Sequence, residues 1–468
     1  MTYDAVIVGG GLSGLSAAVE LSSYGFKTLL LEQRQHLGGR TNSFVDEVTG
    51  DVIDNGQHLM MGCYRETRKY LQTVGAENLM YLQPSLHIDF LRPGGTITSL
   101  SCPTLPPPLH VLAGLMKLDS VPFSHRLSLL NVGKELLWTS PRKEARLESM
   151  TVDSWLTQLG QTEENKKYLW DILAIGTLND SPQSVSALLF FRVLRAAFLG
   201  ARENSCLLIP RVGLSDCLVE PARVFLRDHG GEIRTGAGVY KFNLADDQVA
   251  SAELVNEQVH ARTYVLAVPH HAAPALFDAD ALNRLHFLKD AHAFQSSPII
   301  TINLWFDRHV LHEPFVAVLD SRIQWIFNRT KLLTAGDEKK GESATQHLAV
   351  VISGASTYVE LDKSALVTLA LEDLARVLPV TSRAELLHSL VLKEKRATFS
   401  PRPGVEKLRP GTKTQIQNLF LAGDWTATGL PATIEGSVQS GRAAAAEAAK
   451  FLSHHSLRVD IDSHSHGT

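Results

Sequence analysis

Six residues near the N-terminus have the types and spacing of a phosphate-binding loop. Residues 9–14 read G-G-G-L-S-G and match the pattern GxGxxG. Gly9 permits a tight turn, Gly11 lets a pyrophosphate approach the backbone, and Gly14 lets a helix pack closely on a strand. The helix that follows, with Leu12 and Ser13 at its start, offers N–H groups and a positive dipole to phosphates. The loop therefore predicts dinucleotide binding.

An acidic residue follows this loop where the ribose of an adenosine would lie. Residues 27–31 form a second short apolar run that ends at Glu32, and this completes a strand–helix–strand unit. A carboxylate at this position accepts hydrogen bonds from both ribose hydroxyls and opposes a 2′-phosphate. Glu32, with Gln33 beside it, is therefore predicted to bind the ribose, and NADP is disfavoured here.

The residues directly after the acid distinguish one dinucleotide from another. Residues 37–41 read L-G-G-R-T. We interpret Gly38 and Gly39 as residues that bring the backbone close to the flavin end of a cofactor. Arg40 is then a cation that faces the pyrophosphate or the flavin. This extension is similar to that of flavin amine oxidases and carotenoid desaturases, and it predicts FAD rather than NAD.

The C-terminal part of the chain supplies a second half of the same site. Gly423 and Asp424 follow a short apolar run and resemble the second FAD fingerprint of this superfamily, whose acid contacts the ribitol or the pyrophosphate. Thr433 and Ile434 open the last predicted helix, whose N–H groups can face the pyrimidine end of the flavin. Val239, in a segment that resembles a strand beside the adenine, is the predicted adenine contact. The FAD site is expected to draw on both ends of the chain.

The four cysteines and the missing second glycine motif bear on how the flavin is held and reduced. The cysteines form no CxxC pair and fit neither a metal site nor a disulfide framework. All lie before residue 218, away from the C-terminal segment where some amine oxidases carry a flavin thioether, so we expect noncovalent FAD and no metal. Because no second GxGxxG occurs, the electron donor stays open between a partner protein and a weakly held nicotinamide. The cysteines are Cys63, Cys102, Cys206 and Cys217.

Four further segments narrow the substrate class. Together they resemble the hydroxysqualene dehydroxylases, formerly called squalene-associated FAD-dependent desaturases, and the resemblance runs from residue 3 to about residue 450. It implies reductive dehydroxylation of hydroxysqualene to squalene, a hydrophobic isoprenoid substrate, and a place in squalene and hopanoid biosynthesis. The most specific stretches are N-G-Q-H-x-M and W-T-x-T-G-L-P-A-T. The segments are residues 54–67, 105–110, 207–215 and 423–431.

The candidate catalytic residues lie in the first and third of these segments. The poor leaving group of an allylic alcohol needs an acid to protonate it, and His58 is the first candidate for that acid or for another polar role beside the flavin. Gln57 and Arg211 are weaker candidates. A structural histidine bonded to the backbone is the competing reading of His58, and Asp54 is expected to fix its loop rather than to react.

Two other enzymatic activities remain open on the sequence alone, because fold does not choose a substrate. A carotenoid desaturase of the phytoene type would run an oxidation on a similar hydrocarbon. A flavin amine oxidase would need a lysine that contacts the flavin through water, and Lys289 and Lys331 are the possible lysines. A flavin-binding scaffold without activity is the non-enzymatic alternative.

The elements that must position these residues indicate an α/β protein. We predict a Rossmann-like FAD-binding domain interleaved with a mixed-sheet and helical substrate domain, as in amine oxidases. Two alternating runs around R-P-G-G predict a β-hairpin over residues 87–100, and residues 109–200 are predicted to form a helical module. The predicted boundaries are 1–85, 206–270 and 411–452 for the FAD domain, 86–205 and 271–410 for the substrate domain, and 453–468 for a disordered tail.

Bulk properties limit the partners. The net charge of −4 argues against nucleic acid, since phosphate neutralisation needs a basic surface. No signal peptide and no run of about 20 apolar residues is evident, so we expect a cytoplasmic protein that can lie peripherally on the inner face of the cytoplasmic membrane. The predicted membrane contact is the segment 105–138, with Lys117 and Arg126 facing the headgroups.

Overall fold

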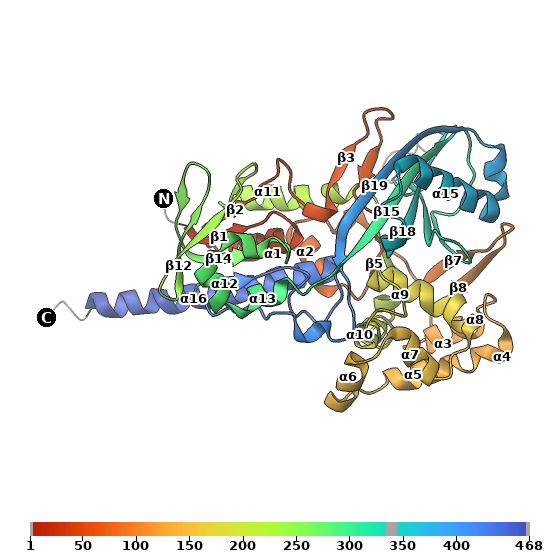
Figure 1. Cartoon of the computed structure of the whole chain (residues 1–468), viewed down its shortest axis with the longest axis horizontal. Helices are drawn as coiled ribbons and strands as arrows, with labels where there is room; N and C mark the ends of the chain where they lie inside the picture. The colour runs from red at the N-terminus through yellow and green to blue at the C-terminus, as the bar shows by residue number, and fades with distance from the viewer. Residues whose placement is uncertain (1–2, 334–343, 465–468) are drawn as a thin grey trace.

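The computed structural model describes residues 3–333 and 344–464, with side chains up to His454. Two sheets of different construction form its frame (Figure 1). The first has five strands in the order β10-β2-β1-β14-β20, and the second has seven in the order β19-β15-β18-β17-β16-β7-β8. Figure 1 shows them side by side, with the helices α3 to α8 gathered below the second sheet.

The five-stranded sheet is parallel throughout, and both of its faces are covered. This explains why its inner strands are continuous apolar runs rather than alternating ones. Helices α1 and α16 pack on one face, and the small antiparallel sheet β11-β12-β13 packs on the other. The strands and helices are β1 Tyr3–Val8, β2 Thr28–Leu31, β10 Glu232–Arg234, β14 Ala261–Leu266, β20 Leu419–Leu421, α1 Leu12–Ser23, α16 Ile434–His464, β11 Lys241–Ala245, β12 Gln248–Glu253 and β13 Gln258–Val259.

The close packing of α1 on α16 depends on small residues. A Cβ on Gly441 of α16 would overlap the carbonyl oxygen of Ser13. Ser16 of α1 donates a hydrogen bond to the carbonyl of Val438 at 2.9 Å. The first and last helices of the chain therefore form one layer on one face of the parallel sheet, and both are labelled in Figure 1.

The seven-stranded sheet separates two apolar cores. Alternate residues of a strand face opposite sides, and Ile300 and Ile302 of β15 pack toward helix α15. Thr301 and Asn303 therefore face the other side, where the helical module lies. The elements are β7 His87–Leu91, β8 Ile97–Ser101, β15 Ser296–Phe306, β16 Phe315–Val318, β17 Trp325–Asn328, α14 Arg329–Leu332, β18 Gln346–Ser353, α15 Lys363–Val377 and β19 Leu386–Phe399.

The helical module is a set of short helices around an aromatic centre. Trp155 is fully buried and makes edge-on contacts with Phe190 and Phe191, whose ring centroids lie 6.3 and 6.2 Å away. The helices are α3 Leu109–Met116, α4 Phe123–Arg126, α5 Leu129–Leu136, α6 Pro141–Glu148, α7 Val152–Gln158, α8 Glu163–Asn165, a π-helical turn Lys166–Trp170, α9 Asp171–Leu178 and α10 Ala187–Phe198.

Shorter elements connect these parts. These include the hairpin β3-β4 and a small sheet, β5-β9-β6. His58 lies in the segment between β4 and β5. These elements are β3 Ser43–Val45, β4 Val52–Asp54, β5 Met60–Met61, α2 Arg65–Thr73, β6 Met80–Leu82, β9 Leu207–Pro210, α11 Glu220–Asp228, α12 Ala279–Arg284 and α13 His286–Ala291.

The predicted α/β class is confirmed, as are the hairpin over residues 87–101 and the helical nature of residues 109–198. The tail differs from its prediction. Helix α16 continues from Ile434 to His464, whereas a disordered tail was expected from residue 453. An established helix gains one backbone bond for each residue that it adds, and the alanine-rich stretch before residue 450 has high helix propensity. Residues 465–468 lie outside the described residues.

Candidate cofactor and active site

The glycines of the first loop leave a hollow beside the start of α1. Gly9 has φ of +112°, and a Cβ there would lie 2.6 Å from the carbonyl oxygen of Ala267. A Cβ on Gly14 would overlap the carbonyl of Gly9. At Gly11, by contrast, no atom of the described residues lies within 4 Å of the Cβ position. The backbone is therefore tightly packed on one side and open on the side where a pyrophosphate would approach.

The start of α1 suits an anion. Among the described residues no side chain caps this helix, and its first turn, which contains Leu12 and Ser13, holds no acidic residue. The first N–H groups of a helix have no partner within the helix and carry a partial positive charge. The loop and the helix start together could hold a phosphate.

Glu32 lies at the end of β2 with its carboxylate turned toward this loop. Its Oε2 accepts a hydrogen bond from the backbone N–H of Gly10 at 2.7 Å, and its Oε1 accepts one from the N–H of Arg34 at 2.8 Å. The segment before Val239 runs alongside, because the N–H of Ala237 donates to the carbonyl of Glu32 at 2.8 Å. Gln33 is exposed at the same edge. The predicted ribose and adenine residues are therefore neighbours.

The segment Gly38 to Arg40 joins the first loop to the C-terminal fingerprint. The N–H of Gly38 donates to the carbonyl of Gly10 at 2.8 Å, and Gly39 has φ of +57°. The Arg40 guanidinium forms an ion pair with Asp424 at 2.7 Å. This ion pair brings together two predicted cofactor residues from opposite ends of the chain.

Ser440, which the sequence did not single out, ties the fingerprints together. Its Oγ accepts a hydrogen bond from the N–H of Gly423 at 2.9 Å and lies 3.4 Å from the Oγ of Ser13. Thr433 caps α16 by accepting from the N–H of Gly436 at 3.1 Å. Small residues along one face of a predicted helix, here Ser437, Ser440 and Gly441, are the signal that could have revealed this contact.

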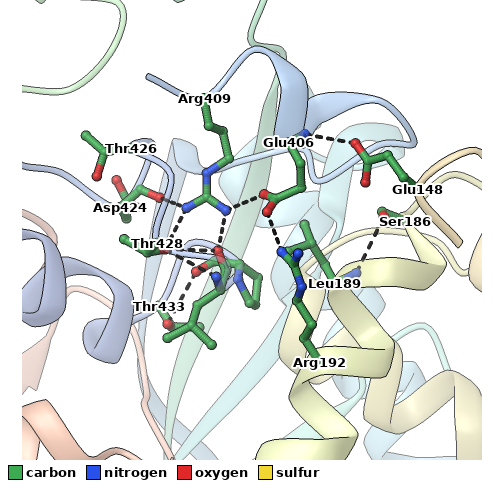
Figure 2. Close-up of polar contacts among 12 residues, drawn as sticks. Glu148, Ser186, Leu189, Arg192, Glu406, Arg409, Asp424, Thr426, Thr428 and Thr433 are labelled. Atoms are coloured by element: carbon green, nitrogen blue, oxygen red, sulfur yellow. Dashed lines mark hydrogen bonds and ion pairs between the residues drawn. The ribbon is translucent and has the colours of Figure 1, made fainter. Parts of the chain in front are cut away.

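The loop after Asp424 is held by a buried arginine (Figure 2). The Arg409 side chain has no exposed surface and donates to the carbonyl oxygens of Asp424 at 2.9 Å and Leu430 at 2.6 Å. It also donates to the hydroxyl of Thr428 at 2.7 Å. Burial lowers the pKa of Arg409, and the adjacent Glu406 carboxylate opposes that shift. No motif surrounds Arg409, and its partners lie on a loop that only the fold brings near, so sequence analysis did not identify it.

Arg409 also connects the loop after Asp424 to the helical module. Glu406 accepts from Arg409 at 2.6 Å through one carboxylate oxygen and from Arg192 of α10 at 2.6 Å through the other. Arg192 in turn pairs with Glu144 of α6 at 2.7 Å. Figure 2 shows the central part of this chain of charges, in which Glu406 lies between the two arginines.

His58 lies in the segment between β4 and β5. Its Nδ1 is 2.8 Å from the carbonyl oxygen of Gly56. A carbonyl can only accept, so Nδ1 carries the hydrogen and Nε2 of the neutral ring is an acceptor. Burial lowers the pKa of His58, with the nearby Arg40 acting in the same direction and Asp54 opposing it. The ring is thus close to the cofactor segment and neutral at pH 7.

Gln57 and Asp54 share one partner, Arg329 of α14. The Arg329 guanidinium donates to Oε1 of Gln57 at 2.7 Å and forms an ion pair with Asp54 at 2.9 Å. Both charged side chains are at most 5% exposed. The other oxygen of Asp54 accepts from Ser43 at 2.6 Å and from the N–H of Leu214 at 2.9 Å, as expected for a residue that fixes its loop.

Arg211, the third predicted catalytic residue, is not brought to the other two. It is exposed at the end of β9, and its guanidinium lies over the ring of Tyr81 at 5.4 Å from the centroid. Arg329 is the arginine that contacts Gln57. The sequence missed it because the two residues are 272 positions apart and no motif surrounds Arg329.

One cysteine lies near the predicted flavin segment in space, although it is far from that segment in sequence. Cys63 lies far from α16 in sequence. The negative charge of Glu435, in the first turn of α16, nevertheless helps to raise the pKa of its thiol. Distance along the chain therefore does not separate this thiol from the predicted flavin segment. Burial raises the pKa of Cys63 to about 12, which keeps the thiol protonated and weakly nucleophilic. No group of three or more potential metal ligands occurs in the described part of the chain.

The residues present fit a flavin dinucleotide. The open side of Gly11, the uncapped start of α1 and the buried Glu32 carboxylate match a pyrophosphate and a ribose. Comparison with known proteins agrees. Residues 12–449 match the model of the flavin containing amine oxidoreductases, and the chain belongs to this family. It is a flavin-dependent oxidoreductase.

Relatives that align over most of their length show which members of the family the chain resembles. The chain is 30% identical to a hydroxysqualene dehydroxylase of Sinorhizobium fredii and 29% identical to one of Rhodopseudomonas palustris, with 95% of this chain and 98% of each relative covered. A 15-cis-phytoene desaturase of Glycine max is 24% identical over 93% of this chain and 78% of its own length. The chain is thus similar to isoprenoid-modifying members of the family.

Solved structures show the same fold at lower identity. An oxidoreductase from Methanosarcina mazei superposes with a TM-score of 0.71 at 17% identity, covering 93% of this chain and 98% of its own. Cyclohexylamine oxidase from Brevibacterium oxydans gives 0.69 at 18% identity, with 96% and 100% covered. The predicted amine-oxidase-like fold is confirmed. Within the described residues, no helix is long and apolar enough to cross a bilayer.

Proposed function

We propose that this chain binds FAD noncovalently and reduces hydroxysqualene to squalene, as a step in squalene and hopanoid biosynthesis. The observation that carries the proposal is the 30% identity to a hydroxysqualene dehydroxylase over 95% of the chain. The geometry supports it, because the segment with Gln57 and His58 lies beside Arg40, and Arg40 pairs with Asp424. The residues that would hold FAD are Gly9, Gly11, Leu12, Ser13, Gly14, Glu32, Gln33, Gly38, Gly39, Arg40, Val239, Gly423, Asp424, Thr433 and Ile434.

The reaction breaks the allylic C–O bond and forms a C–H bond, so one hydride and one proton enter and water leaves. Reduced FAD, when bound, supplies the hydride. The protein must supply the proton, because hydroxide is a poor leaving group. It must also keep water and nucleophiles from the allylic centre, on which positive charge develops.

His58 is the proposed proton donor, through Nε2. The Nδ1–H bond to the Gly56 carbonyl fixes the ring, so a proton taken up from solvent resides on Nε2. Burial lowers the pKa of His58, which makes the imidazolium a stronger acid and leaves it a minor form at pH 7. Protonation of the leaving hydroxyl is therefore expected to be pH-dependent in this range.

Partly buried apolar side chains provide the dry surroundings that a thirty-carbon chain needs. They pack against the main core and keep part of their surface uncovered. Gly176 places α9 beside the indole of Trp325, where a Cβ would lie in ordinary contact, 3.5 Å from Trp325 Nε1. Such walls bind hydrocarbon by burial of apolar surface. Among them are Leu59, Leu173, Ile299, Trp325 and Leu332.

The alternative activities have weaker support. A phytoene-type desaturase is favoured only by relatives at 24–25% identity that extend beyond this chain. An amine oxidase would need a lysine beside the flavin. Lys289 and Lys331 are both exposed, and Lys331 donates to the carbonyl of His312 at 2.8 Å.

An anaerobic half-reaction tests the proposal. The holoenzyme is photoreduced and mixed with hydroxysqualene, phytoene or an amine, and flavin absorbance near 450 nm is followed together with product analysis. Reoxidation by hydroxysqualene with formation of squalene is expected. Reoxidation by none of the three, or reduction of oxidised enzyme by phytoene or by an amine, would contradict it.

The noncovalent state of the flavin has its own test. Acid or heat precipitation should release all of the flavin as FAD, because the half-buried Cys63 thiol, whose pKa is raised to about 12, stays protonated. Yellow colour that remains on the precipitated chain would disprove noncovalent binding. Cys63→Ala then decides whether this cysteine carries the link.

We also propose that the protein contacts the inner face of the cytoplasmic membrane through an apolar surface on the helical module. The structure corrects the predicted contact. Val111, Leu118 and Val121 are core residues, and Arg126 bonds to Val121 and Met116 instead of facing headgroups. The apolar surface consists of the exposed side chains Leu105, Leu109, Phe123, Leu127, Leu137 and Trp138.

Exposed basic residues occur in the same segments as these apolar side chains. Lys117, Lys134 and Arg142 are exposed on the same short helices and connections. Apolar side chains with nearby cations suit an anionic lipid surface, where insertion and electrostatic attraction add. Hydroxysqualene is nearly insoluble in water, so a membrane contact would let the enzyme collect it from the bilayer.

A further inference from the structure

The orientation of the Gln57 side chain is determined by its partner. Arginine has donors only, so the atom of Gln57 that contacts Arg329 at 2.7 Å must be the carbonyl oxygen Oε1. The usual ambiguity between the oxygen and the nitrogen of a carboxamide is thereby removed. The NH₂ group of Gln57 is directed away from Arg329.

Arg329 is itself held firmly. Its side chain is 5% exposed, it pairs with Asp54 at 2.9 Å, and it donates to the carbonyl of Val52 at 3.2 Å. Asp54 is anchored through its second oxygen by Ser43 and by the backbone of Leu214. Neither charged group can turn without breaking several buried bonds, so the position of the guanidinium next to Gln57 is fixed.

The NH₂ group of Gln57 is buried, and within the described part of the chain it has no hydrogen-bond partner. A buried donor without an acceptor destabilises a folded protein, so such groups are rare and need an explanation. The segment packs against the cofactor loops, because the N–H of Asn55 donates to the carbonyl of Asn42 at 2.9 Å. Asn42 directly follows the Gly39–Thr41 turn.

We propose that Arg329 is a positioning residue that aims the Gln57 NH₂ group at a hydrogen-bond acceptor on the bound flavin or on the hydroxyl of the substrate. The second of these acceptors rests on the proposed function. A neutral carboxamide does not transfer a proton, so the bond stabilises its acceptor and leaves the proton donor unchanged. The Asp54–Arg329 pair ensures that a donor rather than a carbonyl faces the site.

Two Gln57 variants separate donation from packing. Gln57→Glu keeps an oxygen opposite Arg329 and replaces the donor by a second oxygen. Gln57→Met removes both polar atoms at similar volume. A loss of about tenfold to a hundredfold in kcat is expected for both, as for the loss of one hydrogen bond to a polar or charged group, with a smaller change in KM.

Arg329→Lys tests positioning. Lysine retains a charge opposite Asp54 but lacks the planar fork that reaches two acceptors. A loss of kcat of about tenfold is expected, and the Arg329→Lys/Gln57→Met double variant should be no slower than Gln57→Met alone. Arg322→Lys is the matched control, because Arg322 pairs with the buried Asp373 of α15, and it should leave kcat unchanged.

Measurements in the absence of substrate distinguish an acceptor on the flavin from an acceptor on the substrate. The absorption spectrum and reduction potential of each holoprotein are recorded in the absence of substrate, with flavin content and Tm as folding controls. A flavin acceptor predicts a changed spectrum or potential in Gln57→Met, and a substrate acceptor predicts an unchanged spectrum with a lower kcat. Where Arg329→Lys does not retain flavin, the two Gln57 variants decide.

The proposal is overturned if folded Gln57→Met keeps wild-type kcat, KM, spectrum and potential. It is also overturned if Arg329→Lys slows the Gln57→Met background as much as it slows the wild type, because Arg329 would then act independently of Gln57. If the wild type does not convert hydroxysqualene, the proposed function fails. The spectrum and potential still test donation to the flavin.

Discussion

The cofactor-binding part and the helical module are held together in different ways. Around the parallel sheet, backbone groups and small residues meet at close range, as where Gly38 bonds to Gly10 and Ser440 reaches Gly423. The helical module depends on large apolar side chains around Trp155. Close backbone contacts restrict residue type and spacing, whereas apolar packing tolerates many sequences of similar volume. The region around the parallel sheet can therefore be recognised from a sequence pattern, whereas the helical module cannot.

Glycines show the contrast most directly. Gly14 has the carbonyl of Gly9 where a Cβ would be placed, while Gly133 of α5 has open space around its Cβ position. Both lie in helices, so local propensity favours alanine at each. Only the tertiary contact distinguishes them.

The largest expected effect is that of Gly14→Ala against Gly133→Ala. Gly14→Ala should abolish flavin binding and lower Tm strongly, because the helix and the loop cannot both keep their positions. Gly133→Ala should stabilise the fold by about 0.5–1 kcal/mol. Flavin content and thermal unfolding measure both. A flavin-replete Gly14→Ala protein of normal Tm would break the comparison.

The second effect concerns the proton donor. His58→Gln should lower kcat by about a hundredfold at acidic pH, as for loss of a general acid. Because burial lowers the pKa of His58, the wild-type rate should be highest below that pKa and fall as pH rises through it. The variant should lose this dependence.

The control for the histidine is His260→Gln. His260 is exposed, and its Nδ1 also lies against a backbone carbonyl, that of Ala250 at 3.0 Å, so it should show an unaltered pH profile. If His58→Gln keeps the wild-type profile, His58 is a structural histidine and the proton comes from another group.

A smaller effect is expected at Glu32. Glu32→Ala removes a carboxylate that can bind both ribose hydroxyls, and charge-assisted hydrogen bonds contribute about 1.5–3 kcal/mol each. The Kd for FAD, measured by flavin fluorescence, should rise tenfold or more. Glu47→Ala, at an exposed position, should leave the Kd unchanged. Tight flavin in Glu32→Ala would show that Glu32 is not the ribose ligand.

The residues compared above differ in whether their role could be predicted from the sequence. The loop at Gly9 to Gly14, the acid Glu32 and the second fingerprint at Asp424 were recognisable because each needs particular residues at a set spacing. The structure brings them together through Arg40 and Asp424. The α/β class and the hairpin followed from local periodicity for the same reason.

Residues whose role depends only on tertiary contact gave no such signal. Arg329 and Arg409 are buried arginines that bind backbone and side-chain oxygens from distant segments. Arg211 is a weaker candidate that was predicted from its motif, and it is exposed beside Tyr81. The exposed face of the helical module was equally hidden, since Leu118 and Phe123 look alike in sequence while one is fully buried and the other is 66% exposed.

The smallest expected effect tests that exposed face. Phe123 and Trp138 are each 66% exposed and belong to the apolar surface of the helical module. Phe123→Ser/Trp138→Ser should reduce binding to anionic vesicles about tenfold, because apolar burial contributes about 0.8 kcal/mol per CH₂ group. Co-sedimentation with phosphatidylglycerol-containing liposomes measures it, and higher salt should weaken the wild type further.

A control on the cofactor side makes this last test specific. Val255 is 82% exposed in the turn between β12 and β13, so Val255→Ser changes exposed apolar surface at a site remote from the module and should not alter sedimentation. Flavin content must stay normal in every variant, because the apolar surface carries no cofactor residue. If the double variant sediments like the wild type, or if the wild type itself stays in the supernatant, the module does not contact the membrane. Hydroxysqualene would then have to reach the site by another face, and the exposed apolar residues of α4 and of the α5–α6 connection would need a different partner.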